Sequence, residues 1–436
     1  MKTISNPSPD KWQKLAERPM IRQEKLTDIV GKMFYEIKRK GDKAVLKFSQ
    51  KFDFSEQTSL AVNKETIEKA TKQVSDELKK AIELARKNIE TFHASQQESV
   101  RKIETTPGVV CWRESRPIER VGIYIPGGTA PLFSTVLMLA VPAKIAGCQE
   151  IVLCTPPDKN GEINPAILYT ANLVGVTKIF AVGGIQAIGA MTFGTETIPK
   201  VDKIFGPGNQ YVMAAKQLTQ YYGTAIDMPA GPSEVLIIAD EMCHPTFVAA
   251  DLLSQAEHGS DSQVILLSIN KQIIKEINRE LDVQLNNLPR KEIAKQALKN
   301  SRAILFDTID ECVEFSNLYA PEHLILAIKN SEIVSKNVIN TGSVFLGNFS
   351  CESAGDYASG TNHTLPTSGY AKAYSGVSLD SFVKKITFQQ LSEEGIQNIG
   401  NTIELMAETE KLFAHKNAVT IRLQEINNKN QDNETI

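Results

Sequence analysis

Cysteine is scarce in this sequence, and the cysteines present are not spaced for a shared metal or for a disulfide framework. The chain has six of them, and none forms a C-x-x-C pair: Cys111, Cys148, Cys154, Cys243, Cys312 and Cys351. Zinc knuckles and disulfide-stapled folds depend on such spacings. We therefore expect neither a disulfide framework nor a metal site built from thiolates.

An excess of charge and long apolar runs are lacking too. The net charge is −3 over 436 residues, and Lys and Arg are scattered, so no basic surface for a phosphate backbone is predicted and nucleic acid is not an expected partner. No apolar run approaches the roughly 20 residues that cross a bilayer. The first residues include Asp10 and Lys11 where a signal peptide would be apolar. We expect a cytoplasmic protein without membrane contact.

The composition is that of a globular protein, with 42% hydrophobic and 23% charged residues, and the length allows two or three domains. From about residue 8 to residue 96 apolar residues recur at helical spacing, first as Ile29, Met33, Phe34 and Ile37. This pattern predicts a helical N-terminal segment. Residues 381–424 predict a helical tail, and the polar end from residue 427 predicts disorder.

Between these segments, strand-like and helix-length stretches alternate. The predicted strands are 121–125, 151–154, 179–182, 203–205, 235–238, 264–267, 303–306, 324–327 and 343–346. Apolar strands joined by helices predict a parallel, doubly wound α/β fold. Their number indicates two sheets, and the turn residues Ala230, Gly231 and Pro232 predict the boundary between them.

Glycines gather at the turns of the first sheet, at 127–128, 183–184 and 206–208. Glycine after a strand lets the main chain approach a phosphate or sugar, and the next helix supplies N–H donors. This predicts a nucleotide crevice. The standard G-x-G-x-x-G is absent, because the nearest match ends in Tyr211, and ordinary turn chemistry explains the glycines nearly as well.

A carboxylic acid and an imidazole stand side by side at Glu322 and His323, after Pro321 and between a helix-like run and a strand. Such a pair can divide acid and base duties if burial raises the carboxyl pKa. For an isolated pair, a helix-capping histidine and a solvated glutamate would be the ordinary explanation. The other histidines change that balance, because most of them also lie beside oxygen donors.

These oxygen donors occur in three stretches. Gln255 and His258 share one predicted helix face, residues 355–363 form a polar loop with too much glycine for a helix, and the tail carries its own acid and histidine. Imidazole combined with carboxylate and amide oxygen suits Zn²⁺ or Mn²⁺. A divalent metal is therefore predicted.

Several longer motifs together resemble those of the histidinol dehydrogenase family. They are YIPGG at 124–128, FGPGN at 205–209, GPSE at 231–234, QAEHG at 255–259, APEH at 320–323 and AHKNA at 414–418. The resemblance extends from about residue 20 to residue 425 in uninterrupted order, and six matches in order are far more specific than any one of them.

The resemblance implies an α/β fold of two incomplete Rossmann-like doubly wound domains with helical N- and C-terminal extensions. The expected parts are an N-terminal extension (1–22), a metal and substrate domain (23–123 and 233–376), an NAD-binding domain (124–232) and a C-terminal helical dimerisation segment (377–436). The extensions would embrace the other subunit of a homodimer with shared active sites.

The activity it implies is the NAD-linked, zinc-dependent oxidation of L-histidinol, through L-histidinaldehyde, to L-histidine at the end of histidine biosynthesis. One Zn²⁺ per subunit would be held by Gln255, His258, Asp356 and the partner subunit's His415. NAD would contact Tyr124, Gln186 and Asn209. The expected substrate-binding residues are Ser233, Gln255, His258, His323, Asp356, His363, Glu410 and His415.

Chemistry supplies a role for each member of the catalytic pair. His323, expected to be neutral at pH 7, would accept the alcohol proton and later the proton of the aldehyde hydrate, while Glu322 would activate water for the second step. Three alternatives remain: a zinc hydrolase with Glu322 as general base, a binding or scaffold protein, and a cysteine thiohemiacetal route. No cysteine lies in a motif that supports the last.

Overall fold

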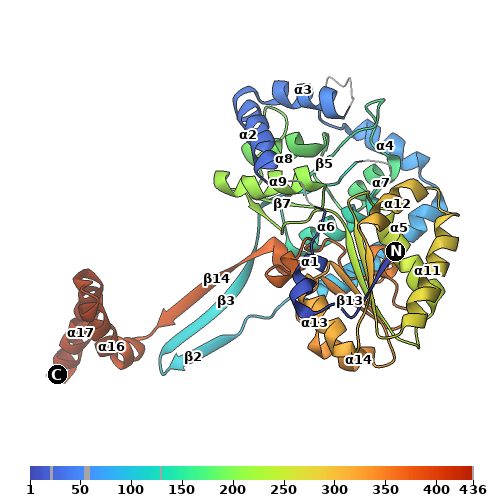
Figure 1. The fold of residues 1–436 in the computed structure, drawn as a ribbon. Coiled ribbons are helices and arrows are strands. Elements are labelled where there is room, and N and C mark those ends of the chain that lie inside the picture. The colour runs from blue at the N-terminus through green and yellow to red at the C-terminus, as the bar shows by residue number, and fades with distance from the viewer. Residues whose placement is uncertain (20–22, 54–58, 128–129, 435–436) are drawn as a thin grey trace. The chain divides into compact units, whose positions relative to one another are not determined.

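A computed structural model describes residues 1–19, 23–53, 59–127 and 130–434. Gly128 of the predicted phosphate-binding turn therefore lies outside the described residues. The chain forms two compact units, one made of Met1–Gln96 and Ile118–Phe382 and the other of Gln97–Pro117 and Val383–Ile436 (Figure 1). None of the described helices is both long enough and apolar enough to span a membrane.

The larger unit contains a parallel five-stranded sheet in the order β6-β5-β4-β7-β8. The strands are β4 (Arg120–Tyr124), β5 (Glu150–Thr155), β6 (Lys178–Ala181), β7 (Lys203–Phe205) and β8 (Ala225–Ile226). Counted along the chain, their order is third, second, first, fourth, fifth. This is the strand order of dinucleotide-binding folds.

A six-stranded parallel sheet in the same unit has the order β1-β11-β10-β9-β12-β13, and without the edge strand β1 its five other strands repeat the order of the first sheet. Its strands are β1 (Lys2–Ser5), β9 (Glu234–Ala239), β10 (Gln263–Ser268), β11 (Arg302–Leu305), β12 (His323–Ala327) and β13 (Ser343–Leu346). The edge strand β1 was not predicted. It is largely exposed and pairs with β11 through its main chain, so its side chains carry no strand pattern.

The nine predicted strands are confirmed, each to within one residue of its observed bounds. The reason is visible in their burial, since β9, β10 and β12 are buried at every position. Strands covered on both faces must be apolar throughout. The last strand of the first sheet, β8, and the first strand of the second sheet other than β1, which is β9, lie on either side of the predicted turn at 230–232.

Helices follow the strands of both sheets. Around the first sheet these are α6 (Phe133–Ala146), α7 (Pro165–Leu173), α8 (Gly184–Phe193) and α9 (Gln210–Thr219). Around the second they are α1 (Trp12–Leu15), α10 (Pro245–Ala256), α11 (Lys271–Leu285), α12 (Lys291–Lys299), α13 (Ile309–Tyr319), α14 (Ser331–Val334) and α15 (Glu352–Tyr357). Helix α6 follows β4 and helix α10 follows β9, so both belong to regular βα units.

The helical N-terminal segment packs against the first sheet. It forms α2 (Gln23–Lys40), α3 (Asp42–Phe52), α4 (Lys64–Gln73) and α5 (Asp76–Ala94). Helix α2 contacts α8 and α9, while α4 contacts α7 and α5 contacts α6. This packing differs from the predicted grouping of 23–123 with the second sheet. An apolar stripe shows that a helix face is buried but not which sheet buries it.

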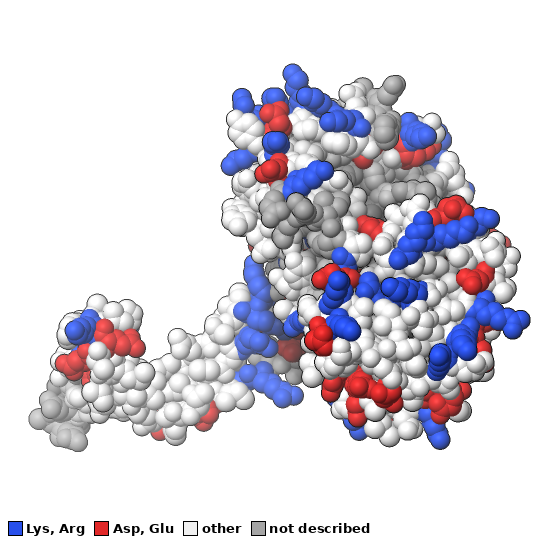
Figure 2. All heavy atoms as spheres, viewed as in Figure 1, with Lys and Arg blue, Asp and Glu red and all other residues white. Residues whose placement is uncertain are grey.

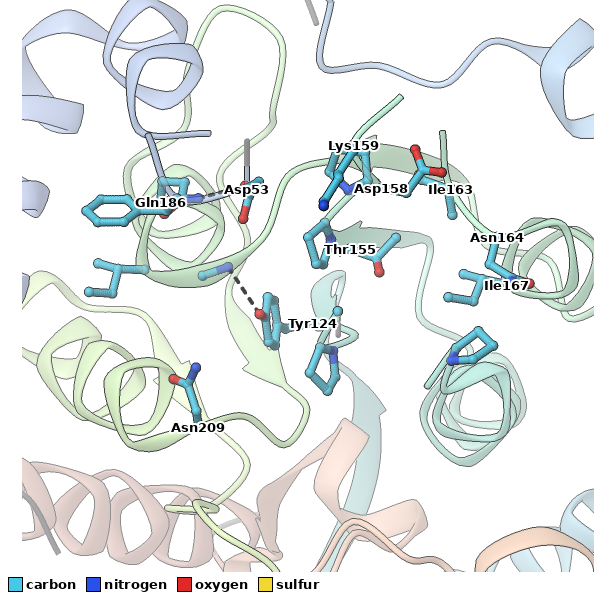
Figure 3. Close-up of a pocket in the computed structure, with 18 of the residues that line it drawn as sticks. Asp53, Tyr124, Thr155, Asp158, Lys159, Ile163, Asn164, Ile167, Gln186 and Asn209 are labelled. Atoms are coloured by element: carbon cyan, nitrogen blue, oxygen red, sulfur yellow. Dashed lines mark hydrogen bonds between the residues drawn. The ribbon is translucent and has the colours of Figure 1, made fainter. Parts of the chain in front are cut away.

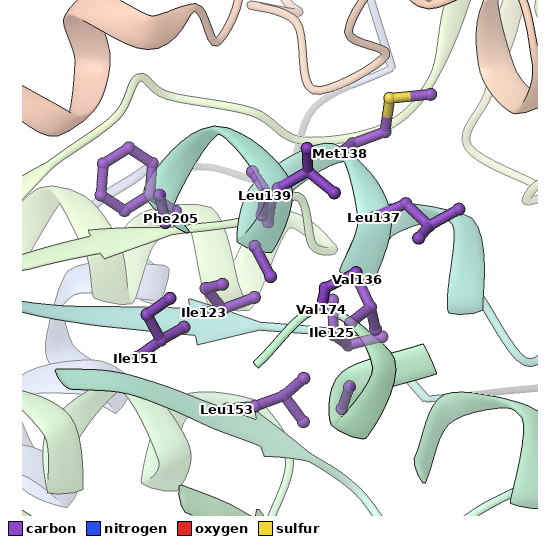
Figure 4. Packing of buried hydrophobic residues seen from close by; sticks show 14 of the residues in the cluster. Ile123, Ile125, Val136, Leu137, Met138, Leu139, Ile151, Leu153, Val174 and Phe205 are labelled. Carbon is purple, nitrogen blue, oxygen red and sulfur yellow. The ribbon is translucent and has the colours of Figure 1, made fainter. Parts of the chain in front are cut away.

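Helix α6 forms the centre of the first core. Ten consecutive residues, from Ser134 to Ala143, are buried. Figure 4 shows Val136 and Leu139 of this helix in one apolar cluster with Ile123 and Ile151 of the strands. Truncating such a buried leucine to alanine costs about 2–5 kcal/mol. The start of α6, which bears on both candidate sites below, is thus held rigidly.

The smaller unit contains an antiparallel sheet and a helix pair. Its elements are β2 (Lys102–Thr106), β3 (Val109–Pro117), β14 (Val383–Leu391), α16 (Glu393–Thr409) and α17 (Phe413–Glu434), with strand order β14-β3-β2. Two predictions are wrong here. Residues 383–391 form a strand, because they pair along nine positions with β3, and the end expected to be disordered continues as helix to Glu434.

Candidate functional site

The predicted metal and catalytic residues of the larger unit lie at the amino edge of the six-stranded sheet. Strands β9 and β12 are neighbours, with His323 of β12 paired with Val235 of β9. Helix α10 returns against the strand direction, so its C-terminal end reaches the same edge with Gln255. The helix ends at Ala256, so His258, predicted to share a helix face with Gln255, instead follows the end of the helix.

Glu322 and His323 are both buried, with 7% and 3% of their surface exposed, so the solvated-glutamate explanation is wrong. Helix α13 ends at Tyr319, and Ala320 takes the left-handed conformation that turns the chain into β12. Glu322 Oε2 accepts a hydrogen bond from the Glu234 N–H at 2.9 Å and lies 3.6 Å from His323 Nδ1. The two proton carriers are thus fixed in contact.

Their environment shifts both pKa values. Burial raises the pKa of Glu322 to about 8, although the neighbouring imidazole opposes this shift. Burial lowers the pKa of His323, but the carboxylates of Glu322, Glu352 and Asp356 outweigh burial and raise it to about 10. These carboxylates favour the charged form of the imidazole, whereas the sequence alone gave no reason to expect that shift. The carboxylates that cause the difference are brought there by folding.

A group of possible metal ligands adjoins this pair. One ligand atom from each of His258, Glu352 and Asp356 lies within 4.8 Å of the others. Gln255 Nε2 donates to Glu352 Oε1 at 2.6 Å and lies 3.0 Å from His323 Nδ1. Its other terminal atom, Oε1, is buried and has no hydrogen-bond partner among the described residues. An unpaired amide oxygen beside two carboxylates and an imidazole fits a divalent cation.

Sequence reasoning missed Glu352. It lies in α15, where the polar loop was expected to be non-helical, so this prediction is wrong for residues 355–357. Residues four apart share a helix face, and the spacing from Glu352 to Asp356 was the signal that could have identified it. Glu352 is fully buried, and its pKa is raised well above the usual range by burial, although the nearby His323 opposes the shift.

His363 links the metal cluster to the first sheet. Its Nδ1 donates to the main-chain carbonyl of Asp356 at 2.9 Å, and its Nε2 lies 3.0 Å from Thr135 Oγ1 in the first turn of α6. Burial lowers the pKa of His363. Ser233 is half-buried one residue before β9, at the same sheet edge. Of the predicted substrate residues, His363 therefore contacts the possible metal ligand Asp356. Ser233 directly precedes Glu234, which hydrogen-bonds Glu322.

Two further predicted residues belong to the smaller unit. Glu410 follows directly after α16, and His415 lies in the first turn of α17. Both are exposed.

A cavity of about 1190 Å³ opens at the carboxyl edge of the five-stranded sheet. Tyr124, Gln186 and Asn209, the three predicted NAD contacts, all line it, and Figure 3 shows them on one side with Asn164 and Ile167 on the other. Ligands of open α/β sheets bind at this edge, where the strand order reverses. The cavity therefore lies where a dinucleotide is expected.

Hydrogen bonds hold the polar groups of this cavity in place. The Tyr124 hydroxyl accepts from the Gly184 N–H at 3.1 Å, and Gln186 Nε2 donates to Asp53 Oδ2 at 2.9 Å (Figure 3). Burial raises the pKa of Asp53. Asp53 was not predicted, because no sequence pattern connects the end of α3 with this cavity. Gly206 is required at its position, since an added Cβ would meet the Tyr124 carbonyl oxygen at 2.1 Å.

On the face of the larger unit drawn in Figure 2, basic and acidic side chains are interspersed. The two candidate sites of this unit are a cavity and a buried group of carboxylates and imidazoles. Dinucleotide strand order, a cavity at the expected edge and a buried acid–base pair are features of an α/β oxidoreductase.

Sequence comparison gives the particular family. The family model described as histidinol dehydrogenase matches residues 16–423, and the chain belongs to this family of NAD-dependent oxidoreductases.

The similar proteins agree with this assignment. The chain is 60% identical to the histidinol dehydrogenase of Bacteroides thetaiotaomicron over 423 residues, covering 97% of this chain and 99% of that one. It is 52% identical to that of Pasteurella multocida over 403 residues, covering 92% and 93%. The crystal structure of histidinol dehydrogenase from Elizabethkingia anophelis superposes with a TM-score of 0.95 at 63% identity, covering 98% and 99%.

Proposed function

We propose that this enzyme oxidises L-histidinol through L-histidinaldehyde to L-histidine, using two NAD. The named activity of its relatives supports the substrate, and one observation supports the chemistry. His323 Nε2 is buried, lies 3.7 Å from Asp356 Oδ1 and has no hydrogen-bond partner among the described residues. Leaving a buried polar atom unpaired costs about 1–3 kcal/mol. A substrate hydroxyl at this nitrogen would relieve that cost.

In the first step, His323 takes the hydroxyl proton at Nε2 while NAD accepts the hydride. The tautomer with its proton on Nδ1, donated to the Glu234 carbonyl 3.2 Å away, leaves Nε2 as the base. In the second step, Glu322 takes a proton from the water that adds to the aldehyde. A carboxyl whose pKa is raised to about 8 is suited to this task near neutral pH. His323 then takes the proton of the hydrate.

We assign Gln255, His258, Asp356 and the partner subunit's His415 to one Zn²⁺ per subunit. When bound, such an ion would orient the imidazole and amine of the substrate. Because Glu352 accepts a hydrogen bond from Gln255 Nε2, the amide presents its oxygen and not its nitrogen to the ion.

NAD is assigned to the cavity at the carboxyl edge of the first sheet. The side chains of Asn164 and Asn209 cap α7 and α9, and the Tyr124 hydroxyl binds the Gly184 N–H of α8. Helix α6 follows the first strand of the sheet and has no side-chain cap at Leu132. An uncapped helix start beside the cavity would attract the pyrophosphate.

The decisive experiment is to count NADH formed per histidinol consumed. Two NADH with little free aldehyde are expected, because the same Glu322–His323 pair serves both steps. A ratio of one would reject the mechanism. Formation of a hydrolysis product without NAD would favour the zinc hydrolase instead, but that alternative gives the NAD-sized cavity no role.

We further propose a homodimer with shared active sites. Leu405, Met406 and Phe413 of the helix pair are 68%, 60% and 61% exposed, and large apolar side chains gathered on one element mark an interaction surface. A second copy of the chain would cover them, and His415 lies two residues from Phe413 on the same helix.

Hybrid dimers test this sharing. His415→Ala and His258→Ala chains are each expected to be inactive, and unfolded mixtures of the two are refolded together. In a symmetric dimer with shared sites, half of the molecules are hybrids with one intact site of two, so about a quarter of wild-type activity returns. Wild-type protein carried through the same refolding provides the reference. No recovery in demonstrated hybrids would reject sharing.

A further inference from the structure

The segment before α2 brings an arginine to the amino edge of the second sheet. Trp12 of this segment is buried, and its ring lies 5.3 Å from that of Phe306 and 6.0 Å from that of Phe315. These edge-to-face contacts anchor the segment on the sheet, because buried aromatic pairs add to the free energy of burial. Arg18 follows six residues later, and its side chain is only 13% exposed.

Arg18 joins two neighbouring strands at their starting ends. Its Nε and Nη2 donate to the two carboxylate oxygens of Glu234 at 2.5 and 2.9 Å, and Nη2 also donates to the Tyr319 carbonyl at 2.8 Å. The guanidinium carbon lies 3.8 Å from the centre of the Tyr319 ring. Glu234 begins β9, and Tyr319 ends the helix that leads into β12. Only arginine offers this planar fork together with ring stacking.

Glu234 in turn holds the catalytic pair through its main chain. Its N–H donates to Glu322 Oε2 at 2.9 Å, and its carbonyl lies 3.2 Å from His323 Nδ1. The carboxylate of Glu234 also accepts from the Ser368 N–H at 2.9 Å. One buried residue therefore carries Arg18 on its side chain and the acid–base pair on its main chain.

We propose that Arg18 is a positioning residue for the reaction: by gripping Glu234 and the turn after Tyr319, it fixes the main chain that aligns Glu322 and His323. This inference rests on the roles proposed above for those two residues. Misalignment of reacting groups by about 1 Å costs on the order of 10²-fold in rate. Arg18 does not line the cavity assigned to NAD, so it would act on the reaction through Glu234 and the turn after Tyr319.

The test must distinguish the positioning effect of Arg18 from its charge, because Arg18 also neutralises the buried carboxylate of Glu234. Removing one partner of a buried ion pair leaves an uncompensated charge and destabilises the fold. Arg18→Lys keeps the charge but loses the fork. Arg18→Met combined with Glu234→Gln removes both charges and also loses the fork. Arg302→Met is the matched control, since Arg302 is half-buried at the start of β11 and, among the described residues, hydrogen-bonds only the Asn300 carbonyl.

All variants are compared as full-length, zinc-loaded enzyme at a temperature where each is folded. For Arg18→Lys and the double variant, kcat for histidinol is expected to fall by about 10- to 100-fold, because the pair loses alignment. The KM for NAD and the zinc content are expected to stay at wild-type values, and Arg302→Met to behave as wild type. A merely structural role would not produce this split between kcat and KM.

Wild-type kcat in both Arg18 variants would overturn the proposal, as would a loss of activity no larger than the loss of folded protein or of zinc. Crystal structures provide a readout that is independent of turnover. The His323 ring is expected to move relative to Asp356 in the double variant, and an unmoved ring would also overturn the proposal. If wild-type enzyme formed no NADH from histidinol, the proposed function would fail. The position of the His323 ring in the double variant would still test whether Arg18 positions the Glu322–His323 pair.

Discussion

Apart from the edge strand β1, the two sheets of the larger unit have the same strand order, but they place their candidate sites at opposite edges. The five-stranded sheet has its cavity at the carboxyl edge, beside the starts of α6, α8 and α9. The six-stranded sheet has its metal and acid–base residues at the amino edge, beside the ends of α10 and α13. The rule that ligands bind at the carboxyl edge of an open α/β sheet therefore agrees with the candidate site of the first sheet but not with that of the second.

Helix polarity gives this difference a physical sense. In a parallel sheet, helix N-termini gather at the carboxyl edge and helix C-termini at the amino edge. N-termini carry partial positive charge and favour phosphate, whereas C-termini carry partial negative charge and favour cations. Gln255 stands in the last turn of α10, so a metal held there would face the negative end of a helix. Each edge thus suits the ligand we assign to it.

Metal removal is expected to have the largest effect, and it separates the two edges. Dialysis against a chelator should abolish NADH formation, because the amino edge loses its cation, while NAD binding measured by calorimetry should persist. Zn²⁺ or Mn²⁺ should restore activity, since mixed nitrogen and oxygen ligands accept both. Full turnover by protein shown to be metal-free by emission spectrometry would contradict the assignment.

Glu322→Gln is expected to have a smaller and divided effect within the amino edge. Oxidation of histidinaldehyde should fall by about 10²- to 10⁴-fold, because only this step needs an activated water, while oxidation of histidinol should lose less. Separate assays with the two substrates measure the split. Equal losses would show that Glu322 does not activate water.

The same variant changes the pH dependence of the alcohol step. Glu322 raises the pKa of His323, so its removal lowers that pKa and the basic form of His323 becomes available at lower pH. The acidic limb of kcat against pH should therefore shift to lower pH. A shift to higher pH would contradict the electrostatic role of Glu322.

Gln186→Ala is expected to have the smallest effect, confined to the carboxyl edge. The KM for NAD should rise by about tenfold, as for the loss of roughly 1.4 kcal/mol of binding, while kcat at saturating NAD changes little. Gln272→Ala, an exposed glutamine on α11, is the matched control and should leave both constants unchanged. A fall in kcat without a rise in KM would place Gln186 outside the cofactor site.

Much of the larger unit could be predicted from local pattern, and the failures have a common cause. Central strands buried on both faces were located to within one residue, but β1 and β14 were missed because each is held by main-chain pairing and is largely exposed. Of the site, Tyr124, Gln186 and Asn209, which were predicted to contact NAD, line the cavity. Asp53 and Glu352 were missed, since neither lies in a motif.

Local sequence pattern was enough to locate the central strands and the glycine turns after them, and it places an acid and an imidazole next to each other at Glu322 and His323. Packing of distant segments was needed to bring those two residues to one sheet edge and to surround them with the groups that shift their pKa values. Burial depends on neighbours brought from elsewhere in the chain, such as Glu234 and Glu352, whose hydrogen bonds and charges reach the pair across β9 and α15. Adjacency in sequence is local, whereas the electrostatic environment is a property of the packed fold.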